Sequence, residues 1–401
     1  MAQLTSFREL KHADTVFGYG FNGMKRCYFF IVLLLSLTLA VNVLLQDKAK
    51  ETVQSPTRTL PAAMHELLDR YSDIGVSVAI TSNGNTFFYQ QGFRDREQSL
   101  PIDTQTQFQL ASISKVFTAV GVLRLVESGK VMLDKPVNQY LSRWQIKSDE
   151  FDASQVTVRH LLDHTSGLSV DGYLGFMPNA TLPTLEDSLN GELGSHSIWT
   201  QLYNRLIPTR QQVTLIQQSG SDWLYSGGGY TVLQLLIEEV SGKLFSAYMQ
   251  EQLLSPLGLK HSTFQFENVD QQQLASGYSG FLSLSPNPNY RYTALAAAGL
   301  YSTIEDLIRF VSVFDASKAT LMSKETRELM LLKHLGIFSY GEFAEQRVFG
   351  HNGNNMGGWH SAFRVVPQTG DAIALLSNDD RSEALIAELI ELWQQSEASS
   401  H

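Results

Sequence analysis

The sequence predicts an α/β protein of the α+β type, in which an antiparallel sheet formed by N- and C-terminal segments is flanked by helices and carries a mostly helical insertion lobe. Three features lead to this prediction. Strand-like segments occur near residues 75–89 and 361–376, the stretch of about 116–285 is mostly helical in pattern, and residues 382–394 form a last amphipathic helix. Strands bury their apolar faces by pairing, so the two ends of the chain are expected to share one sheet.

The first strand pair is expected just before residue 90. Residues 76–80 alternate valine or isoleucine with smaller side chains, and residues 86–89 (TFFY) form a second strand-like run. Asn83-Gly84 lies between them and is typical of a tight hairpin turn, because both residues tolerate positive φ. The segment therefore predicts an antiparallel hairpin.

The helical stretch begins with a run after Lys115 whose apolar residues follow the i, i+3, i+4, i+7 spacing of a helix buried on one face, and Gly129 is placed to end it. A second helix is expected over 231–240, closed by Gly242. A third is expected to begin at residues 302–305 (STIE), which carry a capping-box signature. No internal repeat interrupts this order.

The C-terminal part returns to strands. Residues 361–366 and 372–376 are expected to pair across a turn at residues 367–370 (PQTG). The last helix, 382–394, places on one face Leu385, Ile386, Leu389, Ile390 and Trp393. This helix is expected to cover one face of the sheet.

Composition bounds the possible functions. Of 401 residues, 43% are apolar and 17% charged, which is typical of a globular protein, and the net charge of -10 argues against a nucleic-acid partner. Cys27 is the only cysteine and lies in a hydrophobic run, so the folded part has no thiol nucleophile and no zinc–thiolate site. His351 and His360 lack neighbouring ligands that would complete a metal site. No metal or cofactor is expected.

The N-terminus predicts export. Residues 28–45 carry no charge and are long enough to span a bilayer, with Lys25 and Arg26 just before them. Two interpretations stay open, namely a single-pass anchor with the rest of the chain on the periplasmic side, or a signal peptide that starts at Met24 and is cleaved. The expected divisions are a short cytoplasmic or n-region segment (1–26), the anchor or signal peptide (27–45), a linker (46–60) and the folded domain (61–396, with the helical lobe at about 116–285).

Ser112-Ile113-Ser114-Lys115 is the first candidate for chemistry. In a helix, residues i and i+3 lie on nearly the same face, so Ser112 and Lys115 are expected to be neighbours at its first turn. The positive end of the helix dipole there favours a neutral lysine that can take the serine proton. The same spacing also suits a serine N-cap followed by an ordinary exposed lysine.

Two glycine-dense segments are candidates for the rest of the site. Tyr225 lies in a segment (WLYSGGGY) that is expected to be a loop ahead of a helix, where a tyrosine can relay a proton and glycines let the backbone approach a ligand. His351 lies in FGHNGNNMGG, where a histidine can supply charge or a hydrogen bond and free backbone N–H groups can bind an oxyanion. A buried tyrosine and a surface loop are the structural alternatives.

Residues 161–168 (LLDHTSGL) combine histidine, serine and glycine, but the chain has no G-x-S-x-G nucleophile elbow. The expected role is a buried structural turn in which His164 and Thr165 bond to backbone.

In this order the segments resemble the serine β-lactamase and penicillin-binding-protein-like family, in its branch of class C β-lactamases, D-alanyl-D-alanine carboxypeptidases and esterases. The resemblance covers most of residues 62–393 and rests on six segments, which are 109–115 (QLASISK), 161–168 (LLDHTSGL), 225–227 (YSG), 255–259 (SPLGL), 298–303 (AGLYST) and 351–353 (HNG).

The resemblance implies a β-lactamase/transpeptidase-like fold and an acyl-enzyme formed on Ser112. Lys115 and Tyr225 then share the general acid and base work. The oxyanion hole is implied to be the backbone N–H groups of Ser112 and Asn354. His351 and Gly353 are implied to bind substrate, as part of the segment that occupies the place of the family's K-T-G or H-x-G motif.

One position departs from the family. Gly227, also implied to line the substrate, stands where the family usually has an asparagine that bonds the substrate's amide. We therefore expect a serine hydrolase that acts on an ester, a small peptide or amide, or a cell-wall-derived substrate, and that turns over β-lactams poorly. The alternative is a non-catalytic member that binds cell-wall fragments or a protein partner. Neither the substrate, nor transfer to an acceptor other than water, nor the oligomeric state is readable from the sequence.

Overall fold

The computed structural model describes five stretches of the chain, namely residues 60–192, 212–280, 285–318, 321–343 and 345–398. The expected cytoplasmic segment, the anchor or signal peptide and the linker up to residue 59 lie outside these stretches. Within them, no helix has both the length and the apolar character that crossing a bilayer requires.

A six-stranded antiparallel sheet forms the centre of the domain, in the order β2-β1-β12-β11-β10-β9. The N- and C-terminal strands meet where β1 pairs with β12, for example Val78 with Leu375. The predicted fold class is therefore confirmed. The strands of this sheet are β1 (Val76–Ser82), β2 (Asn85–Gln91), β9 (Phe338–Phe343), β10 (Gln346–Asn355), β11 (Trp359–Val365) and β12 (Ala372–Ser377).

The predicted hairpin between β1 and β2 is confirmed. Asn83 and Gly84 form its turn with φ angles of 50° and 77°, and Ser82 pairs with Asn85 directly across it. Positive φ at both turn positions matches the twist of the flanking strands, which explains why this pair of residues predicts the turn correctly.

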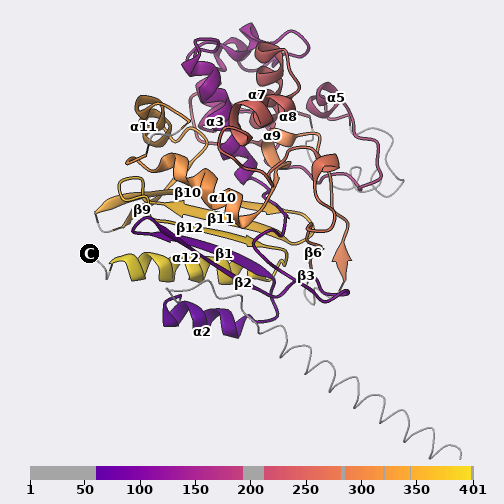
Figure 1. Cartoon of the computed structure of the whole chain (residues 1–401). Coiled ribbons are helices and arrows are strands. Elements are labelled where there is room, and N and C mark those ends of the chain that lie inside the picture. The colour runs from indigo at the N-terminus through magenta and orange to yellow at the C-terminus, as the bar shows by residue number, and fades with distance from the viewer. Residues whose placement is uncertain (1–59, 193–211, 281–284, 319–320, 344, 399–401) are drawn as a thin grey trace, which may run out of the picture. The chain divides into compact units, whose positions relative to one another are not determined.

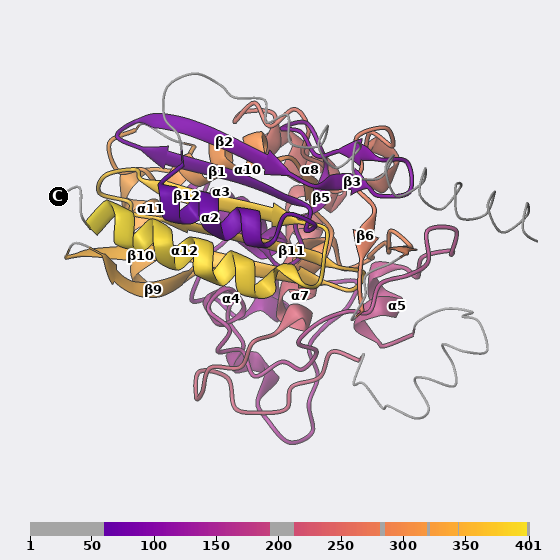
Figure 2. The same ribbon diagram turned by 90° about the horizontal axis from the view of Figure 1, so that it is seen from below.

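Two helices cover one face of the sheet, α2 (Ala62–Arg70) and α12 (Ser382–Ala398), and they lie side by side beneath it in Figures 1 and 2. The apolar residues predicted for the last helix are all buried there, and Trp393 is fully enclosed. Side chains alternate along a strand, so Ala362 and Val366 of the segment around β11 point toward this layer.

The helical lobe lies on the opposite face of the sheet (Figure 1). Its central helix, α3, is buried on nearly every side and ends before Gly129, whose φ is 71°. The helices on this side are α3 (Ile113–Glu127), α4 (Val158–Leu162), α5 (Leu185–Leu189), α7 (Gly227–Ser241), α8 (Phe245–Met249), α9 (Leu295–Ala298), α10 (Ile304–Val311) and α11 (Lys324–Leu332).

Two helix starts differ from the prediction. Helix α7 begins at Gly227, so the three glycines expected in a loop form its first turn, capped by the Ser226 side chain. A β-carbon on Gly228 would lie 2.5 Å from the carbonyl oxygen of Ser169, which shows that close packing requires glycine there. Helix α10 is capped by Thr303, which accepts from the Asp306 N–H, one residue later than the predicted capping box.

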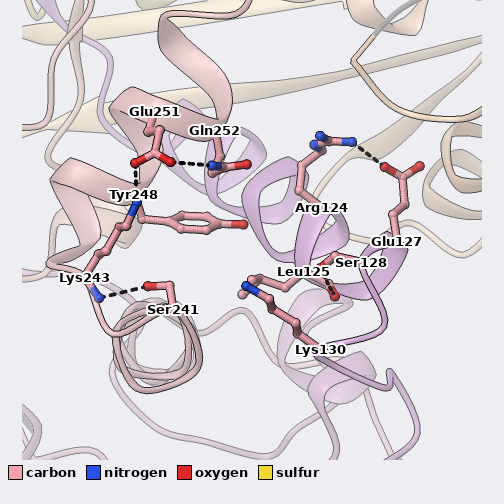
Figure 3. Close-up of a pocket in the computed structure, with 10 residues that line it drawn as sticks. All are labelled: Arg124, Leu125, Glu127, Ser128, Lys130, Ser241, Lys243, Tyr248, Glu251 and Gln252. Atoms are coloured by element: carbon pink, nitrogen blue, oxygen red, sulfur yellow. Dashed lines mark hydrogen bonds and ion pairs between the residues drawn. The ribbon is translucent and has the colours of Figure 1, made fainter.

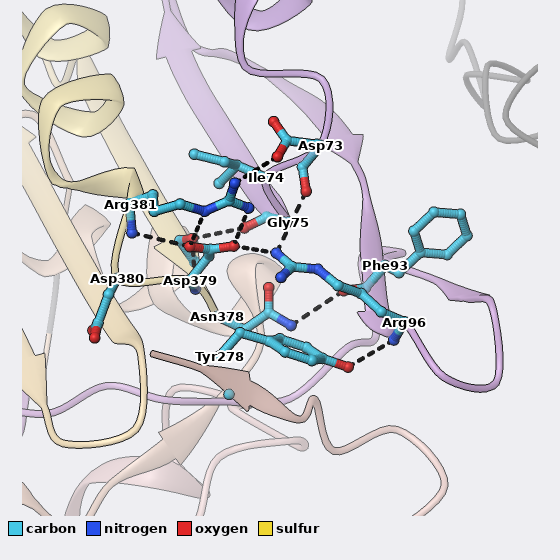
Figure 4. A network of polar contacts seen from close by, with 12 residues as sticks. Asp73, Ile74, Gly75, Phe93, Arg96, Tyr278, Asn378, Asp379, Asp380 and Arg381 are labelled. Carbon is cyan, nitrogen blue, oxygen red and sulfur yellow. Dashed lines mark hydrogen bonds and ion pairs between the residues drawn. The ribbon is translucent and has the colours of Figure 1, made fainter. Parts of the chain in front are cut away.

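Short strand pairs and a buried ion network close one end of the sheet. Strand β3 (Phe93–Asp95) pairs with β4 (Leu100–Pro101), β5 (Phe108–Gln109) with β8 (Tyr301–Ser302), and β6 (Gly277–Tyr278) with β7 (Pro286–Asn287). Between β12 and α12, the fully buried carboxylate of Asp379 forms ion pairs with Arg96 and Arg381 (Figure 4). The hydroxyl of Tyr278 accepts the Arg96 N–H at 2.7 Å. This network ties the β3 segment to the start of α12.

Candidate active site

Ser112 lies at the N-terminal end of α3, directly before its first residue. Ala111, which precedes it, is fully buried and has a positive φ of 48°. A non-glycine residue in this left-handed region costs about 1–2 kcal/mol, so the surrounding packing must impose the turn. The strained turn is the point at which the chain passes from β5 into α3 and presents the Ser112 side chain.

Lys115 is beside Ser112 as the i, i+3 spacing predicts. Its Nζ lies 3.2 Å from the Ser112 Oγ and donates to the carbonyl oxygen of Ala297 at 2.8 Å. Lys115 is only 2% exposed, so the interpretation as an ordinary exposed helix lysine is wrong. A buried amine held by a hydroxyl and a carbonyl is placed to exchange a proton with the serine.

Tyr225 is also at this site. Its ring centroid lies 5.0 Å from the Lys115 Nζ. The tyrosine is half-buried, immediately ahead of α7, and its ring stacks on that of His164 with centroids 4.5 Å apart. The structure therefore brings the three predicted catalytic residues together from α3 and from the segment before α7.

Strand β10 passes directly beside the Ser112 backbone. A β-carbon on Gly353 would lie 2.5 Å from the carbonyl oxygen of Leu110 and 3.0 Å from the Ser112 nitrogen. Asn354, the other residue implied for the oxyanion hole, follows Gly353 on this strand. Asn355 fixes the strand's end, because its side-chain amide donates to Gln109 and to the Ala298 carbonyl.

His351 faces the site from β10 as a neutral imidazole. Burial, together with the charge of Lys115, lowers the pKa of His351 to about 3. Its Nδ1 lies 2.5 Å from the carbonyl oxygen of Asn352, which requires the proton on Nδ1 and leaves Nε2 as an acceptor. Nε2 has no hydrogen-bond partner within the described part of the chain. Of the two roles expected for His351, the geometry therefore favours a hydrogen bond over a positive charge.

At Gly227 the sequence differs from the family motif, and neighbouring atoms also occupy the space that a side chain would need. A β-carbon there would lie 3.0 Å from the carbonyl oxygen of Asp171 and 3.4 Å from the ring of Tyr173. The segment around Asp171 and Tyr173 thus packs against the position at which the family motif is expected to have an asparagine. Gly227 provides no such side chain, and the Asp171 carbonyl and the Tyr173 ring leave little room for one.

A cavity of about 510 Å³ extends from Ser112 past the edge of β10 toward α12. Arg364 of β11 lines it and is only 5% exposed, and burial lowers the pKa of its guanidinium to about 10. Arg364 donates to Asn352 Oδ1 at 2.9 Å and lies over the ring of Tyr340. Among the described residues no carboxylate forms an ion pair with it, although Glu383 lines the same cavity. The cavity therefore contains a buried guanidinium, and Ser112 lines the same cavity.

A second cavity, of about 400 Å³, lies at the opposite end of α3 (Figure 3). Its charged side chains largely pair with one another, Arg124 with Glu127 and Lys243 with Glu251, and the remaining cation, Lys130, is exposed to solvent. Within the described ranges, no cluster of three or more histidine, cysteine or acidic side chains is placed to hold a metal ion.

The predicted structural turn at residues 161–168 is partly confirmed. His164 Nδ1 accepts the backbone N–H of Ser226, whereas the Thr165 hydroxyl donates to the side chain of Asp163. Sequence reasoning missed the strain at Ala111 and the cavity around Arg364. Both depend on how segments that are distant in the sequence pack together, and no local sequence pattern predicts them.

A serine and lysine one helical turn apart, beside a tyrosine and strand β10 of an antiparallel sheet, define the class of serine β-lactamases and penicillin-binding proteins. The model of the Beta-lactamase family matches residues 60–395, and the chain belongs to that family of serine hydrolases.

Individual relatives are distant. The chain is 26% identical over 275 residues to a β-lactamase of Providencia stuartii, covering 69% of this chain and 64% of the relative. It is 25% identical over 243 residues to protein flp of Staphylococcus aureus (strain MW2), covering 59% of this chain and 44% of flp. The chain thus spans less than two thirds of either relative.

Among solved structures, the penicillin-binding protein homologue of Pyrococcus abyssi, described as octameric, superposes with a TM-score of 0.61. It is 26% identical and covers 79% of this chain and 72% of its own.

Proposed function

We propose that this chain is a serine hydrolase that forms an acyl-enzyme on Ser112 and hydrolyses an ester or a small peptide or amide. The observation that carries the proposal is the 3.2 Å contact between the Ser112 Oγ and the buried Nζ of Lys115, with Tyr225 alongside. The nucleophile and its proton acceptor are already within hydrogen-bonding distance, the arrangement that activates a weak nucleophile.

In the proposed reaction, the Ser112 Oγ attacks the substrate's carbonyl carbon while its proton passes to the Lys115–Tyr225 pair. The carbonyl oxygen becomes an oxyanion, which the backbone N–H groups of Ser112 and Asn354 are proposed to stabilise. Collapse of this intermediate breaks the bond to the leaving group, which takes the proton. Water then attacks the acyl-enzyme and gives its proton to the same pair. The bond between the acyl carbon and the Ser112 Oγ breaks, the acid is released, and the pair returns the proton to the Ser112 Oγ.

Weak β-lactamase activity is part of the proposal. Gly227 supplies no side-chain donor for a substrate amide, and the Asp171 carbonyl lies close to the position where that side chain would begin. The acyl-transfer groups do not depend on this donor. We therefore propose that acylation is retained while β-lactam recognition is poor.

The cavity beside Ser112 supports an acidic group on the substrate. A buried guanidinium without a carboxylate partner gains most from a ligand that brings a negative charge, because charge-assisted hydrogen bonds are strong in a desolvated site. Arg364 is such a group, and the same cavity reaches Ser112. We propose that substrates place a carboxylate there.

Export of the domain, with residues 28–45 as a membrane anchor or a cleaved signal peptide, remains our proposal from the sequence. It is supported by the uncharged apolar run preceded by Lys25 and Arg26. A substrate of periplasmic or cell-wall origin would be consistent with that location.

The test is covalent labelling. The full chain is incubated with a fluorophosphonate probe and with a fluorescent penicillin, and the modified peptide is identified by mass spectrometry. We expect fluorophosphonate labelling at Ser112, its loss in Ser112→Ala, and no change in Ser128→Ala, which removes an exposed serine at the other end of α3. Labelling that persists in Ser112→Ala contradicts the proposal.

A wild type that reacts with no acylating probe would instead favour a non-catalytic protein that binds cell-wall fragments or a partner.

For a protein that is labelled at Ser112, a panel of esters, D-amino-acid peptides and β-lactams assigns the substrate class. Within the panel, Arg364→Met should reduce kcat/KM for carboxylate-bearing esters about tenfold or more and leave neutral esters nearly unchanged. An equal loss for both groups contradicts the role proposed for Arg364.

A further inference from the structure

His164 contacts both chain neighbours of Tyr225. Its carbonyl oxygen accepts the Leu224 N–H at 2.8 Å, and its Nδ1 accepts the Ser226 N–H at 3.0 Å. The backbone on either side of Tyr225 is thus fixed to a single residue that lies about sixty positions earlier in the chain.

The imidazole also supports the phenol ring directly. The rings of His164 and Tyr225 stack with centroids 4.5 Å apart and planes inclined by 30°. Tyr230, the residue at which α7 completes its first turn, packs against the same imidazole at 5.2 Å. His164 is only 1% exposed, so the imidazole that supports Tyr225 is itself held in place by its surroundings.

The protonation state of His164 is fixed by the same contacts. An Nδ1 that accepts an N–H carries no proton, so the neutral ring has its proton on Nε2. Burial, reinforced by the charge of Lys115, holds the pKa of His164 well below its usual range. The backbone at His164 is left-handed, with φ of 62°, a conformation that histidine adopts more readily than most residues.

We propose that His164 is the positioning residue for Tyr225, holding the phenol toward Ser112 and Lys115 by two backbone hydrogen bonds and one ring stack. The inference rests on the proposed function, because it assigns a purpose to the position of Tyr225. A residue that only stabilised a structural turn would affect acylation whether or not Tyr225 is present, whereas we expect the effect of His164 to depend on Tyr225.

The test is a double-mutant cycle on fluorophosphonate labelling rates. His164→Leu removes the acceptor and the stacking ring, and we expect it to slow labelling about 100-fold, the cost of a misplacement of about 1 Å. In a Tyr225→Phe background the same substitution should cost less than about threefold, because the group it positions is already gone.

Two further variants separate positioning from folding. His164→Asn keeps an acceptor at the place of Nδ1 and tolerates positive φ, so we expect an intermediate loss of about tenfold. If His164→Leu does not fold, His164→Asn takes its place in the double-mutant cycle. His334→Leu is the matched control, because His334 is a second left-handed, partly buried histidine and has no contact with Tyr225 among those described. It should label at nearly the wild-type rate.

Equal losses in the wild-type and Tyr225→Phe backgrounds would overturn the proposal, and so would a loss in His334→Leu as large as that in His164→Leu. If the wild type reacts with no probe, the proposed function fails. The positioning contact is then decided by a crystal structure of His164→Leu or His164→Asn. A Tyr225 ring that has not moved overturns the inference, and a displaced ring supports it.

Discussion

The contact between β10 and the Ser112 turn leads to a quantitative prediction for Gly353→Ala. The added β-carbon would lie 2.4 Å from the Ser361 Oγ, 2.5 Å from the Leu110 carbonyl oxygen and 3.0 Å from the Ser112 nitrogen. The hydroxyl can rotate away, but the other two atoms belong to the backbone. Restoring a contact of 3.4 Å to Leu110 requires strand and turn to separate by about 1 Å.

A separation of that size should affect activity more than stability. Overpacking costs about 1–3 kcal/mol in unfolding free energy, which a domain of this size is expected to survive. Misplacing the nucleophile and the proposed oxyanion donors should slow acylation about 100- to 1,000-fold. The assay pairs the fluorophosphonate labelling rate with urea unfolding of the same variant.

Two controls identify the cause. Gly172→Ala adds a methyl group that meets no atom within 4 Å and should label at nearly the wild-type rate. Adding Ser361→Ala to Gly353→Ala removes only the hydroxyl clash, so labelling should stay slow. A labelling rate of Gly353→Ala within about threefold of wild type, or full recovery in the double variant, would refute the reasoning.

Three further predictions concern other parts of the site and fold. Gly227→Asn should not raise nitrocefin turnover, because the Asp171 carbonyl crowds the new side chain; a tenfold gain would contradict this. Burial lowers the pKa of His351 in the folded state to about 3, so below about pH 6.5 the unfolded chain binds more protons than the folded one. The free energy of unfolding should therefore fall as the pH drops toward 3, and it should fall less steeply in His351→Gln. Identical slopes in the wild type and the variant would contradict this prediction. Asp379→Asn leaves two arginines without their buried carboxylate and should lower the unfolding free energy by about 3 kcal/mol, with labelling of the folded variant unchanged; a loss below about 0.5 kcal/mol would exclude a stabilising network.

Local signals predicted much of this structure because the physics behind them is local. Asn83-Gly84 sets its own φ angles and so forms the hairpin turn independently of the rest of the chain. Ser112 and Lys115 are three residues apart on one helix, which is enough to bring their side chains together. The apolar face of α12 likewise follows from its own spacing.

The misjudged features depend on distant contacts. Three consecutive glycines predict a loop, yet α7 begins with them, capped by the Ser226 side chain. Gly228 is glycine because the Ser169 carbonyl leaves no room for a β-carbon, which is a packing requirement rather than a loop signal. The strain at Ala111 and the placement of Arg364 depend in the same way on how β10 and β11 meet the rest of the domain. Propensity describes a segment alone, whereas these positions are decided by what packs against it.

The recognition groups differ from the implied family pattern more than the acyl-transfer groups do. At Gly227 the amide donor is missing, and at His351 a neutral ring presents an acceptor where a cation was one expectation. The positive charge in the adjoining cavity instead comes from Arg364, which approaches from β11 on the α12 side of the sheet. If the site binds an acidic group through Arg364, as we propose, it still has no side chain at position 227 that could bond a substrate amide, and so little means at that position to favour an amide over an ester. We therefore expect the ratio of ester to amide turnover to follow the intrinsic reactivity of the bond, with the carboxylate governing which substrates are bound.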